Sequence, residues 1–219
     1  MTDSQLAAGT YEVLRNRLRQ CADRLFTLYR DLTDEGLSLI SDVRAEALIE
    51  LLEHLRSLGH RTIDCVHCHR GYREYEKRVA IWEGFLAEHG LRGQVWDCSD
   101  SPEQGEQRKV ASYMRNVLRD GRTDATAIVG LSVITGWGIA RAAADAQLSI
   151  PGDLSLAVFG PAEHAAQSVP SITSLQQPAI SEMIRRAVAC SRESPLEAAQ
   201  VIEPERINLF RGESTAAPR

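Results

Sequence analysis

Short apolar runs alternate with amphipathic helical segments along the chain, and this alternation limits the possible folds more than any other feature of the sequence. The run Thr126–Leu131 is almost uniformly apolar, which is typical of a strand buried on both faces. We predict strands over residues 37–40, 62–66, 94–98, 126–131 and 154–159. The alternation predicts an α/β fold with a doubly wound parallel sheet and right-handed crossovers.

The segments between these runs carry helical signals. Apolar residues recur at three- and four-residue steps between Leu48 and Leu55, and Gly59 follows them as a C-terminal glycine does. A similar stripe runs from Tyr11 to Leu28 near the N-terminus. We predict helices over residues 1–35, 42–58, 75–89, 106–120, 139–146 and 180–191, and a short strand over residues 207–210.

Composition and charge narrow the class of protein. The 219 residues are 43% hydrophobic and 25% charged, as in globular chains, and no apolar stretch reaches the ~18 residues of a membrane span. A net charge of −5 and 5% aromatic residues argue against a stand-alone nucleic-acid binder. The chain has five cysteines, an odd number that cannot all pair in disulfides within one chain. The first residues contain no basic segment of the kind that begins a signal peptide. We therefore expect a cytoplasmic protein with reduced thiols and no membrane partner.

A series of local strings follows the order seen in a known family. Asp42 is followed by a helix and a Gly-His pair, and later strings carry Gly-Phe, Thr-Ala-Ile, Ile-Pro-Gly-Asp and Ser-Thr motifs. The strings occupy residues 54–63, 84–90, 126–128, 148–155, 170–173, 177–178 and 209–215. Together they cover residues 37–217 and resemble the effector-binding domain of the LacI/GalR (lactose-repressor and galactose-repressor) family of bacterial transcription regulators.

The resemblance implies a periplasmic-binding-protein-like fold, a Rossmann-like sandwich of three layers in two subdomains. Residues 41–219 are assigned to the effector-binding domain, and residues 1–40 to a helical segment that is a remnant or a substitute of the first subdomain. That subdomain is expected to be incomplete. Members of the family also begin with a helix-turn-helix headpiece bearing a GVS..TVSR.LN string, and no such string occurs in this sequence. DNA is therefore expected to be a partner only through a headpiece absent from this chain.

In this family the effector lies in the cleft between the subdomains, outside the carboxyl edge of the sheet. Sugar-binding members place an arginine three residues before the Gly-Phe pair, a position that holds Ile81 here. Arg78 lies one helical turn earlier on the same face. We expect it either to replace that arginine or to be a solvated surface residue. The loop and helix start before it add His69 and Arg73 to the predicted ligand-binding residues.

Two acidic positions of the family also differ here. The Asn-Asp pair after the strand at 126–131 falls on Ser132 and Val133, and the Asp after the next strand falls on Gly160. A site that hydrogen-bonds hydroxyls loses affinity without its polar partners. We therefore expect weak sugar binding and a less polar effector, or none. Trp137 is expected either to pack in the core or to stack against a ligand ring at the end of this strand.

Cys65, His67, Cys68 and His69 form a cluster of metal-ligand types, with the cysteines in C-x-x-C spacing. On a strand, Cys68 points away from the other three, which suits a tetrahedral site poorly. We favour a buried Cys65 beside pocket or loop histidines over a metal site, and over a redox-active thiol. No metal and no cofactor are predicted.

The sequence also lacks G-x-S-x-G, G-x-x-x-x-G-K-[ST] and G-x-G-x-x-G motifs, so we predict no enzymatic activity. The resemblance predicts a ligand-sensing domain that binds a small effector in a cleft and, as a homodimer, controls DNA binding allosterically. Two alternatives stay open. One is a periplasmic-type sugar or solute-binding protein, which the missing export signal disfavours. The other is a truncated remnant that binds no ligand and interacts with proteins.

Overall fold

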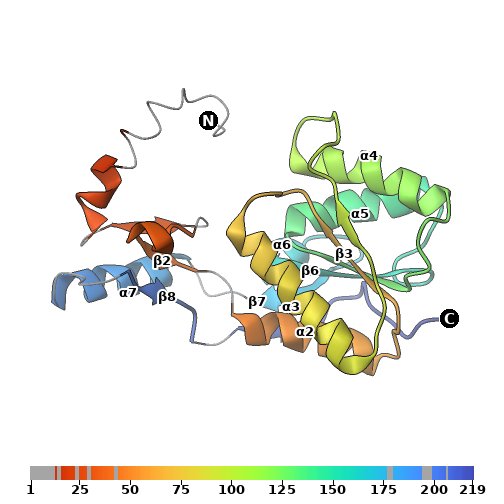
Figure 1. Ribbon diagram of the computed structural model, residues 1–219. Coiled ribbons are helices and arrows are strands. Elements are labelled where there is room, and N and C mark those ends of the chain that lie inside the picture. Colours follow the sequence, from red (N-terminus) through yellow and green to blue (C-terminus); the bar gives the residue numbers. More distant parts are fainter. Residues whose placement is uncertain are drawn as a thin grey trace. The chain divides into compact units, whose positions relative to one another are not determined.

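The computed structural model describes residues 13, 16–22, 25–28, 31–41, 44–176, 180–193, 199–205 and 207–219 (Figure 1). By packing, the chain divides into two compact units. The small unit comprises Met1–Val43 and Pro178–Glu205, and the large unit comprises Arg44–Gln177 and Arg206–Arg219. Residues 178–205 thus group with the N-terminal residues. The assignment of domains at residue 40 stays a prediction.

The large unit is built on a six-stranded sheet of order β4-β3-β5-β6-β7-β9. The first five strands are parallel, and β9 pairs antiparallel with β7 at one edge, a common addition to parallel sheets. This arrangement confirms the predicted parallel α/β sheet. The strands are β3 (Ile63–His67), β4 (Val95–Asp97), β5 (Ala127–Gly130), β6 (Ser155–Pro161), β7 (Thr173–Gln176) and β9 (Asn208–Phe210).

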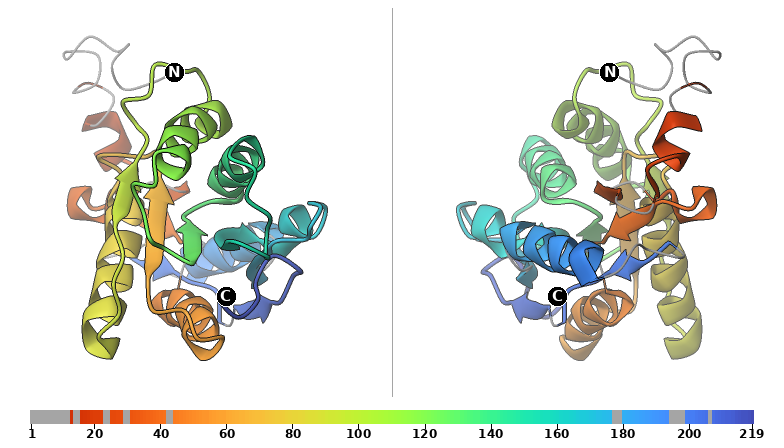
Figure 2. Two further views of the ribbon diagram at one scale, coloured as in Figure 1. Left: turned by 90° about the vertical axis from the view of Figure 1, so that its right-hand side faces the viewer. Right: turned by 90° about the vertical axis from the view of Figure 1, so that its left-hand side faces the viewer.

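Helices cover both faces of this sheet and make three layers (Figure 2). One face carries α2 (Ala45–Ser57) and α3 (Arg73–His89), and the other carries α4 (Glu106–Arg119) and α5 (Val133–Asp145). On the α4–α5 face, helix residues pack against β5 and β6 in an apolar core. Its members include Val110, Met114, Ile139, Ile128, Leu156 and Val158. Gly138 allows the close approach of α5 to α4, because a Cβ there would lie 2.7 Å from the Cβ of Val110.

The helix predicted over residues 139–146 begins earlier than expected. In the structure α5 starts at Val133, because the Ser132 hydroxyl accepts a hydrogen bond from the backbone N–H of Thr135 (2.9 Å) and caps the helix. The first turns contain two glycines and β-branched residues, which hide the helical pattern. Strand β7 and the single-turn helix α6 (Ala162–Ala165) were not predicted.

The small unit contains a parallel three-stranded sheet of order β1-β2-β8, with strands Phe26–Leu28, Ser38–Ile40 and Val201–Ile202. Helix α7 (Ile180–Glu193) contributes Met183 and Ala187 to a core shared with this sheet. The predicted strand at 37–40 is confirmed.

The continuous helix predicted over residues 1–35 is wrong at Phe26–Leu28, which forms β1, and at Thr33–Glu35, which forms a short 3-10 helix. Pairing with Ser38–Ile40 satisfies the backbone of Phe26–Leu28, and this tertiary pairing overrides the local three- and four-residue pattern. Tyr11, Asp42 and the string at residues 177–178, which entered the sequence argument, lie outside the described residues.

Candidate functional site

The carboxyl ends of the five parallel strands meet at one edge of the large unit's sheet, which we call the carboxyl edge. From β3 the chain runs outward to β4 on one side, and then crosses to β5, β6 and β7 on the other. The strand order therefore reverses between β3 and β5. In open α/β sheets, ligands bind outside the carboxyl ends of the strands at such a reversal. The residues around this point form the candidate functional site.

Arg78 points from α3 towards the end of β5. Its side chain is buried, with the residue 5% exposed, and Nη1 donates a hydrogen bond to the carbonyl oxygen of Leu131 (2.9 Å). The guanidinium carbon lies 4.3 Å from the ring centre of Phe159 and 4.8 Å from that of Tyr75. Two aromatic rings and a carbonyl thus fix the arginine. It is therefore not the solvated surface residue of the alternative interpretation.

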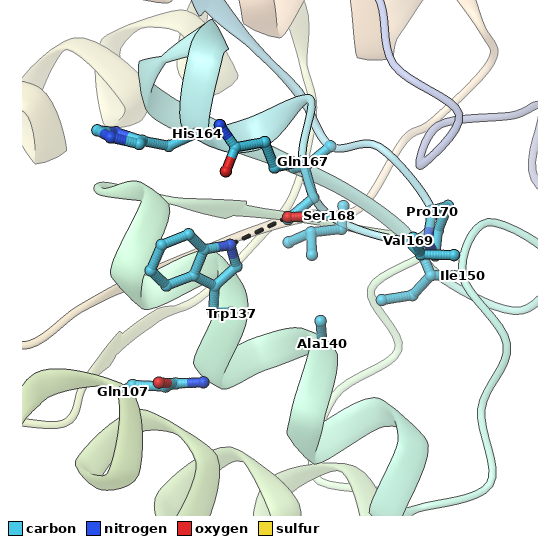
Figure 3. A pocket seen from close by; sticks show the side chains of 11 residues that line it. Gln107, Trp137, Ala140, Ile150, His164, Gln167, Ser168, Val169 and Pro170 are labelled. Atoms are coloured by element: carbon cyan, nitrogen blue, oxygen red, sulfur yellow. Dashed lines mark hydrogen bonds between the residues drawn. The ribbon is translucent and has the colours of Figure 1, made fainter.

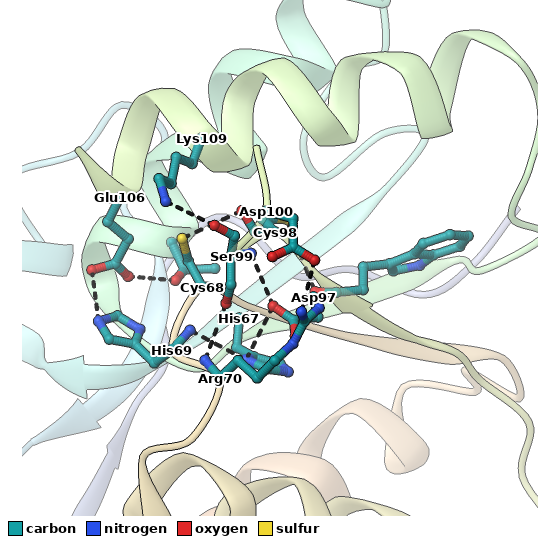
Figure 4. A network of polar contacts seen from close by, with 12 residues as sticks. His67, Cys68, His69, Arg70, Asp97, Cys98, Ser99, Asp100, Glu106 and Lys109 are labelled. Carbon is teal, nitrogen blue, oxygen red and sulfur yellow. Dashed lines mark hydrogen bonds and ion pairs between the residues drawn. The ribbon is translucent and has the colours of Figure 1, made fainter. Parts of the chain in front are cut away.

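His69 lies in the loop after β3, and its imidazole faces the Glu106 carboxylate (Figure 4). Its ring stacks on Tyr75 at 4.1 Å and meets Tyr72 edge-on at 5.7 Å. Its Nε2 is 3.5 Å from Oε2 of Glu106. Burial lowers the pKa of His69 below its ordinary value, and the Glu106 carboxylate opposes this shift in part. Among the described residues, Nδ1 has no hydrogen-bond partner although it is buried.

Glu106 is the first residue of α4, and its carboxylate connects three elements of the carboxyl edge. Oε1 accepts hydrogen bonds from the hydroxyls of Ser132 and Thr135, the latter at 2.6 Å, while Oε2 faces His69. The side chain is only 16% exposed. We call Glu106, His69, Ser132 and Thr135 the acidic cluster. It places one negative charge and several hydroxyl and imidazole groups next to the end of β5.

Val133 and Gly160 pack directly against each other. A Cβ at position 160 would lie 2.6 Å from Cγ2 of Val133 and 3.2 Å from its backbone nitrogen. Val133 is 5% exposed and belongs to the core on the α4–α5 face. The valine side chain therefore fills the space that a side chain at position 160 would need. This part of the edge is apolar.

The other predicted site residues lie apart from the acidic cluster. Ile81 is half-buried on α3, one turn after Arg78, and Arg73 is exposed at the start of the same helix. Trp137 lies on α5, and its Nε1 donates a hydrogen bond to the hydroxyl of Ser168 (3.0 Å; Figure 3). It borders a separate cavity of about 440 Å³, lined by Gln107, Ala140, Ile150, Leu156, His164, Gln167, Val169, Pro170 and Ile172 as well.

A second polar network joins the loops after β3 and β4 (Figure 4). Nε of Arg70 lies 2.6 Å from Asp97, and its Nη1 lies 2.7 Å from Asp100. The hydroxyl of Ser99 accepts the backbone N–H of Arg70 (3.0 Å), and its carbonyl accepts a hydrogen bond from Lys109 (2.8 Å). These contacts fix the loop that carries His69.

The cysteine-histidine cluster of residues 65–69 does not gather into one site. In the described part of the chain, no group of three histidine, cysteine, aspartate or glutamate side chains is placed to hold a metal ion. Cys65 is completely buried, and burial raises the pKa of its thiol far above the ordinary value.

None of the helices in the described ranges combines the length and apolar character that crossing a bilayer requires.

Sequence reasoning missed Glu106, Tyr75 and Phe159 as parts of the site. No motif or spacing marks any of the three. Glu106 at the start of α4 reads as an ordinary acidic residue in a first helical turn. Only the crossing of the chain between β4 and β5 brings it beside Ser132.

The chain matches a known domain family. The family model of the periplasmic binding protein-like domain matches residues 52–215. Among curated proteins, none matches the chain significantly.

Solved structures share the fold at low sequence identity. An uncharacterized protein from Actinobacillus succinogenes has a TM-score of 0.75 at 20% identity, over 95% of this chain and 75% of that one. A LacI family transcriptional regulator from Enterococcus faecium with bound ribose has a TM-score of 0.76 at 17% identity, over 97% and 78%. A LacI family regulator from Mycobacterium smegmatis has a TM-score of 0.70 at 20% identity, over 93% and 85%. These likenesses confirm the periplasmic-binding-protein-like fold that the sequence strings predicted.

Proposed function

Since the chain belongs to the family of periplasmic binding protein-like domains, we propose that it is the ligand-sensing domain of a LacI/GalR-type transcription regulator in the cytoplasm. One observation carries this proposal. Arg78 and the acidic cluster bring charged and polar side chains from three elements to the strand-order reversal, where open α/β sheets bind ligands.

We propose that the effector contacts this edge through predicted residues that come from four segments. They are His69, Arg73, Arg78, Ile81, Ser132, Val133, Trp137 and Gly160, and the structure adds Glu106 to the proposal. Arg78 presents a fixed cation, and Glu106 and Ser132 offer an acceptor and a hydroxyl. Val133 and Gly160 supply an apolar surface. Trp137, which borders the other cavity, is the member farthest from this chemistry.

The proposed effector is less polar than a free sugar. The Enterococcus faecium relative was solved with bound ribose. In this chain, Ile81, Val133 and Gly160 stand at three positions where sugar-binding relatives carry charged side chains. Each lost charge-assisted hydrogen bond weakens binding by about 1.5–3 kcal/mol, or roughly ten- to hundredfold. Free pentoses and hexoses are therefore expected to bind outside the micromolar range.

A thermal-shift screen followed by calorimetry tests this proposal. The panel contains ribose, common hexoses, their phosphates, and aromatic and aliphatic acids and amines of similar size. We expect no micromolar binding of free sugars, and a hit whose affinity falls at least tenfold in Arg78→Lys. Arg141→Lys, at an exposed arginine on α5, is the control and leaves affinity unchanged. Micromolar ribose binding that survives Arg78→Lys contradicts the proposed site.

The two alternative functions make different predictions in the same experiments. A periplasmic-type solute-binding protein binds a free sugar or solute tightly as a monomer. A truncated remnant binds no member of the panel. Two of the relatives with this fold are transcription regulators, which supports a non-enzymatic role for this chain. We therefore propose no catalytic activity.

We also propose a homodimer, as the resemblance implies. Val169 is 98% exposed and borders the cavity beside Trp137. An interface with two-fold symmetry pairs the same surface of both subunits, so the protruding apolar side chain of each could enter the cavity of the other. We expect sedimentation velocity at micromolar concentration to show a species of twice 24.2 kDa, and Val169→Asp to shift it to monomer. Ile49→Asp, at an exposed apolar residue of α2, is the matched control. A monomeric wild-type chain contradicts this part of the proposal.

A further inference from the structure

Cys68 and Cys98 lie next to each other where β3 and β4 end. His67 and Asp97 are register partners in these parallel strands, and the ladder continues, because the backbone N–H of Cys98 donates to the carbonyl of His67 (2.8 Å). Cys68 and Cys98 are therefore the next pair in register. We call them the cysteine pair (Figure 4).

The two side chains point to the same face of the sheet. Val66 and Trp96, two residues earlier in each strand, both belong to the core on the α4–α5 face, and side chains alternate with a period of two. Cys98 is part of that core, and Cys68 packs against it. The Sγ of Cys68 lies 3.6 Å from the carbonyl oxygen of Cys98.

This geometry suits a disulfide. Neighbouring strands lie about 4.7–4.9 Å apart, within the roughly 4.4–6.8 Å between Cα atoms that a disulfide spans. Cys65, the other half of the C-x-x-C string, lies on the opposite face by the same alternation. The motif that the sequence singles out therefore pairs the wrong cysteines, and the fold supplies a different partner for Cys68.

The two thiols differ in access. Cys98 is completely buried, whereas Cys68 is half-buried. Burial raises the pKa of both thiols; at Cys68 the Lys109 cation opposes this shift, whereas the carboxylates of Glu106 and Asp97 add to it. Cys68, which is only half-buried, is therefore the thiol that an oxidant reaches.

We propose that Cys68 and Cys98 form a reversible disulfide when the protein meets a hydroperoxide. The Cys68 thiolate attacks the terminal oxygen of the hydroperoxide, the O–O bond breaks, and the leaving alkoxide takes a proton to become an alcohol. Cys68 is now a sulfenic acid. The sulfur of Cys98 then attacks the Cys68 sulfur, and its proton leaves with the hydroxide as water. The two thiols lose two electrons, and the hydroperoxide gains them.

The disulfide would tie together the loops that carry the candidate site. His69 and Arg70 follow Cys68 directly, and Ser99, which binds the backbone of Arg70, follows Cys98. Oxidation therefore acts on the loop that holds His69 against Glu106. The inference does not depend on the proposed effector, because it rests only on the position of the two thiols.

Peptide mapping of the oxidised wild-type chain tests the proposal. After treatment with hydrogen peroxide and denaturation, we expect thiol titration to fall by two from the five cysteines of the chain. Trypsin places Cys65 and Cys68 together in residues 62–70 and Cys98 in residues 93–108. The expected product is a cross-link between these two peptides, in a chain that migrates as a single chain on a non-reducing gel and regains both thiols with dithiothreitol.

Three other outcomes overturn the proposal: a disulfide within peptide 62–70, a disulfide-linked dimer, or five thiols that survive oxidation. Variants give a second test. Cys68→Ser and Cys98→Ser are expected to abolish the cross-link, and Cys98→Ser leaves a sulfenic acid at Cys68 that dimedone traps. Cys65→Ala is the matched control, since it removes a buried cysteine of the same strand and keeps the cross-link.

Discussion

The carboxyl edge of the large unit has a polar part and an apolar part. At the start of α4, Glu106 holds a carboxylate nearly out of solvent by accepting hydrogen bonds from Ser132 and Thr135 and facing His69. A few residues away, Val133 and Gly160 remove polar groups altogether and fill the space between them with a valine side chain. Both parts touch the same turn between β5 and α5.

The difference shows that one edge of a sheet can combine two chemistries. The strand-end part with Val133 and Gly160 is apolar, while an acid enters from the start of a helix. A carboxylate at that place is supported by the N-terminus of α4, whose backbone N–H groups favour negative charge. The polar and apolar parts therefore make separate predictions.

Removing the carboxylate of Glu106 is expected to have the largest effect on stability. Glu106→Ala leaves the hydroxyls of Ser132 and Thr135 and the imidazole of His69 without their shared acceptor. We expect the free energy of unfolding to fall by about 3 kcal/mol, measured by urea denaturation. Glu106→Gln keeps one acceptor oxygen, and we expect its free energy of unfolding to fall by about half as much.

The control for this prediction is Glu103→Ala, at an exposed glutamate shortly before α4. A surface substitution there is expected to change stability by less than about 0.5 kcal/mol. Equal losses in the two alanine variants would show that the acidic cluster contributes nothing beyond an exposed charge.

Adding a methyl group at position 160 is expected to lower the free energy of unfolding by somewhat less. In Gly160→Ala the new Cβ meets Cγ2 of Val133 at 2.6 Å, and the backbone nitrogen of Val133 leaves little room to move. Overpacking of this kind lowers the free energy of unfolding by about 1–3 kcal/mol. In the double variant with Val133→Ala, we expect most of the cost of Gly160→Ala to disappear. Additive effects in this double-mutant cycle would contradict direct packing of the two residues.

Local sequence pattern predicted the large unit better than the small one. The strands at residues 62–66 and 126–131 and the helix around Leu48–Leu55 are long enough, and apolar enough, to show their period. Strand β1 has only three residues, and pairing with β2 decides its structure. The three- and four-residue pattern of the surrounding residues extends across β1, so the helical interpretation of residues 1–35 failed there.

Site residues could be predicted from the sequence only where they follow a predicted strand or lie close to a sequence motif of the family. Arg78 was identified because it lies one turn before Ile81, and the structure places it against Leu131 and two aromatic rings. Glu106 was not identifiable, because its role depends on hydroxyls 26 and 29 residues away in sequence. Contacts of this kind appear only once the crossover between β4 and β5 is formed.

Replacing the planar guanidinium of Arg78 tests the α3 side of the carboxyl edge. Arg78→Lys keeps the charge but loses the flat group that lies over Phe159 and Tyr75. We expect a loss of about 1–2 kcal/mol in the free energy of unfolding, because an ammonium group does not reproduce stacking between rings. Arg141→Lys, at an exposed ion pair, is expected to change stability by less than about 0.5 kcal/mol. An equal loss in both variants would place Arg78 at the surface in solution.

The smallest expected effect compares the histidines at the two ends of β3. Burial lowers the pKa of both His60 and His69 below the ordinary 6.5. His60 is bonded to neutral groups, Thr126 (2.8 Å) and the carbonyl of Ala216 (2.9 Å), whereas His69 faces the carboxylate of Glu106. The unfolded chain binds protons more readily than either folded site, so stability is complete above pH 6.5 and falls on acidification towards the folded pKa.

We therefore expect His60→Gln to flatten the dependence of unfolding free energy on pH between pH 7 and pH 5. His69→Gln is expected to flatten it less, because the Glu106 carboxylate stabilises the protonated ring and narrows the gap between folded and unfolded pKa values. In a Glu106→Gln background that support is gone, and the effect of His69→Gln should approach that of His60→Gln. Urea titrations of the four variants across this pH range measure the slopes. A larger effect for His69→Gln than for His60→Gln in the wild-type background would mean that the carboxylate does not reach the ring in solution.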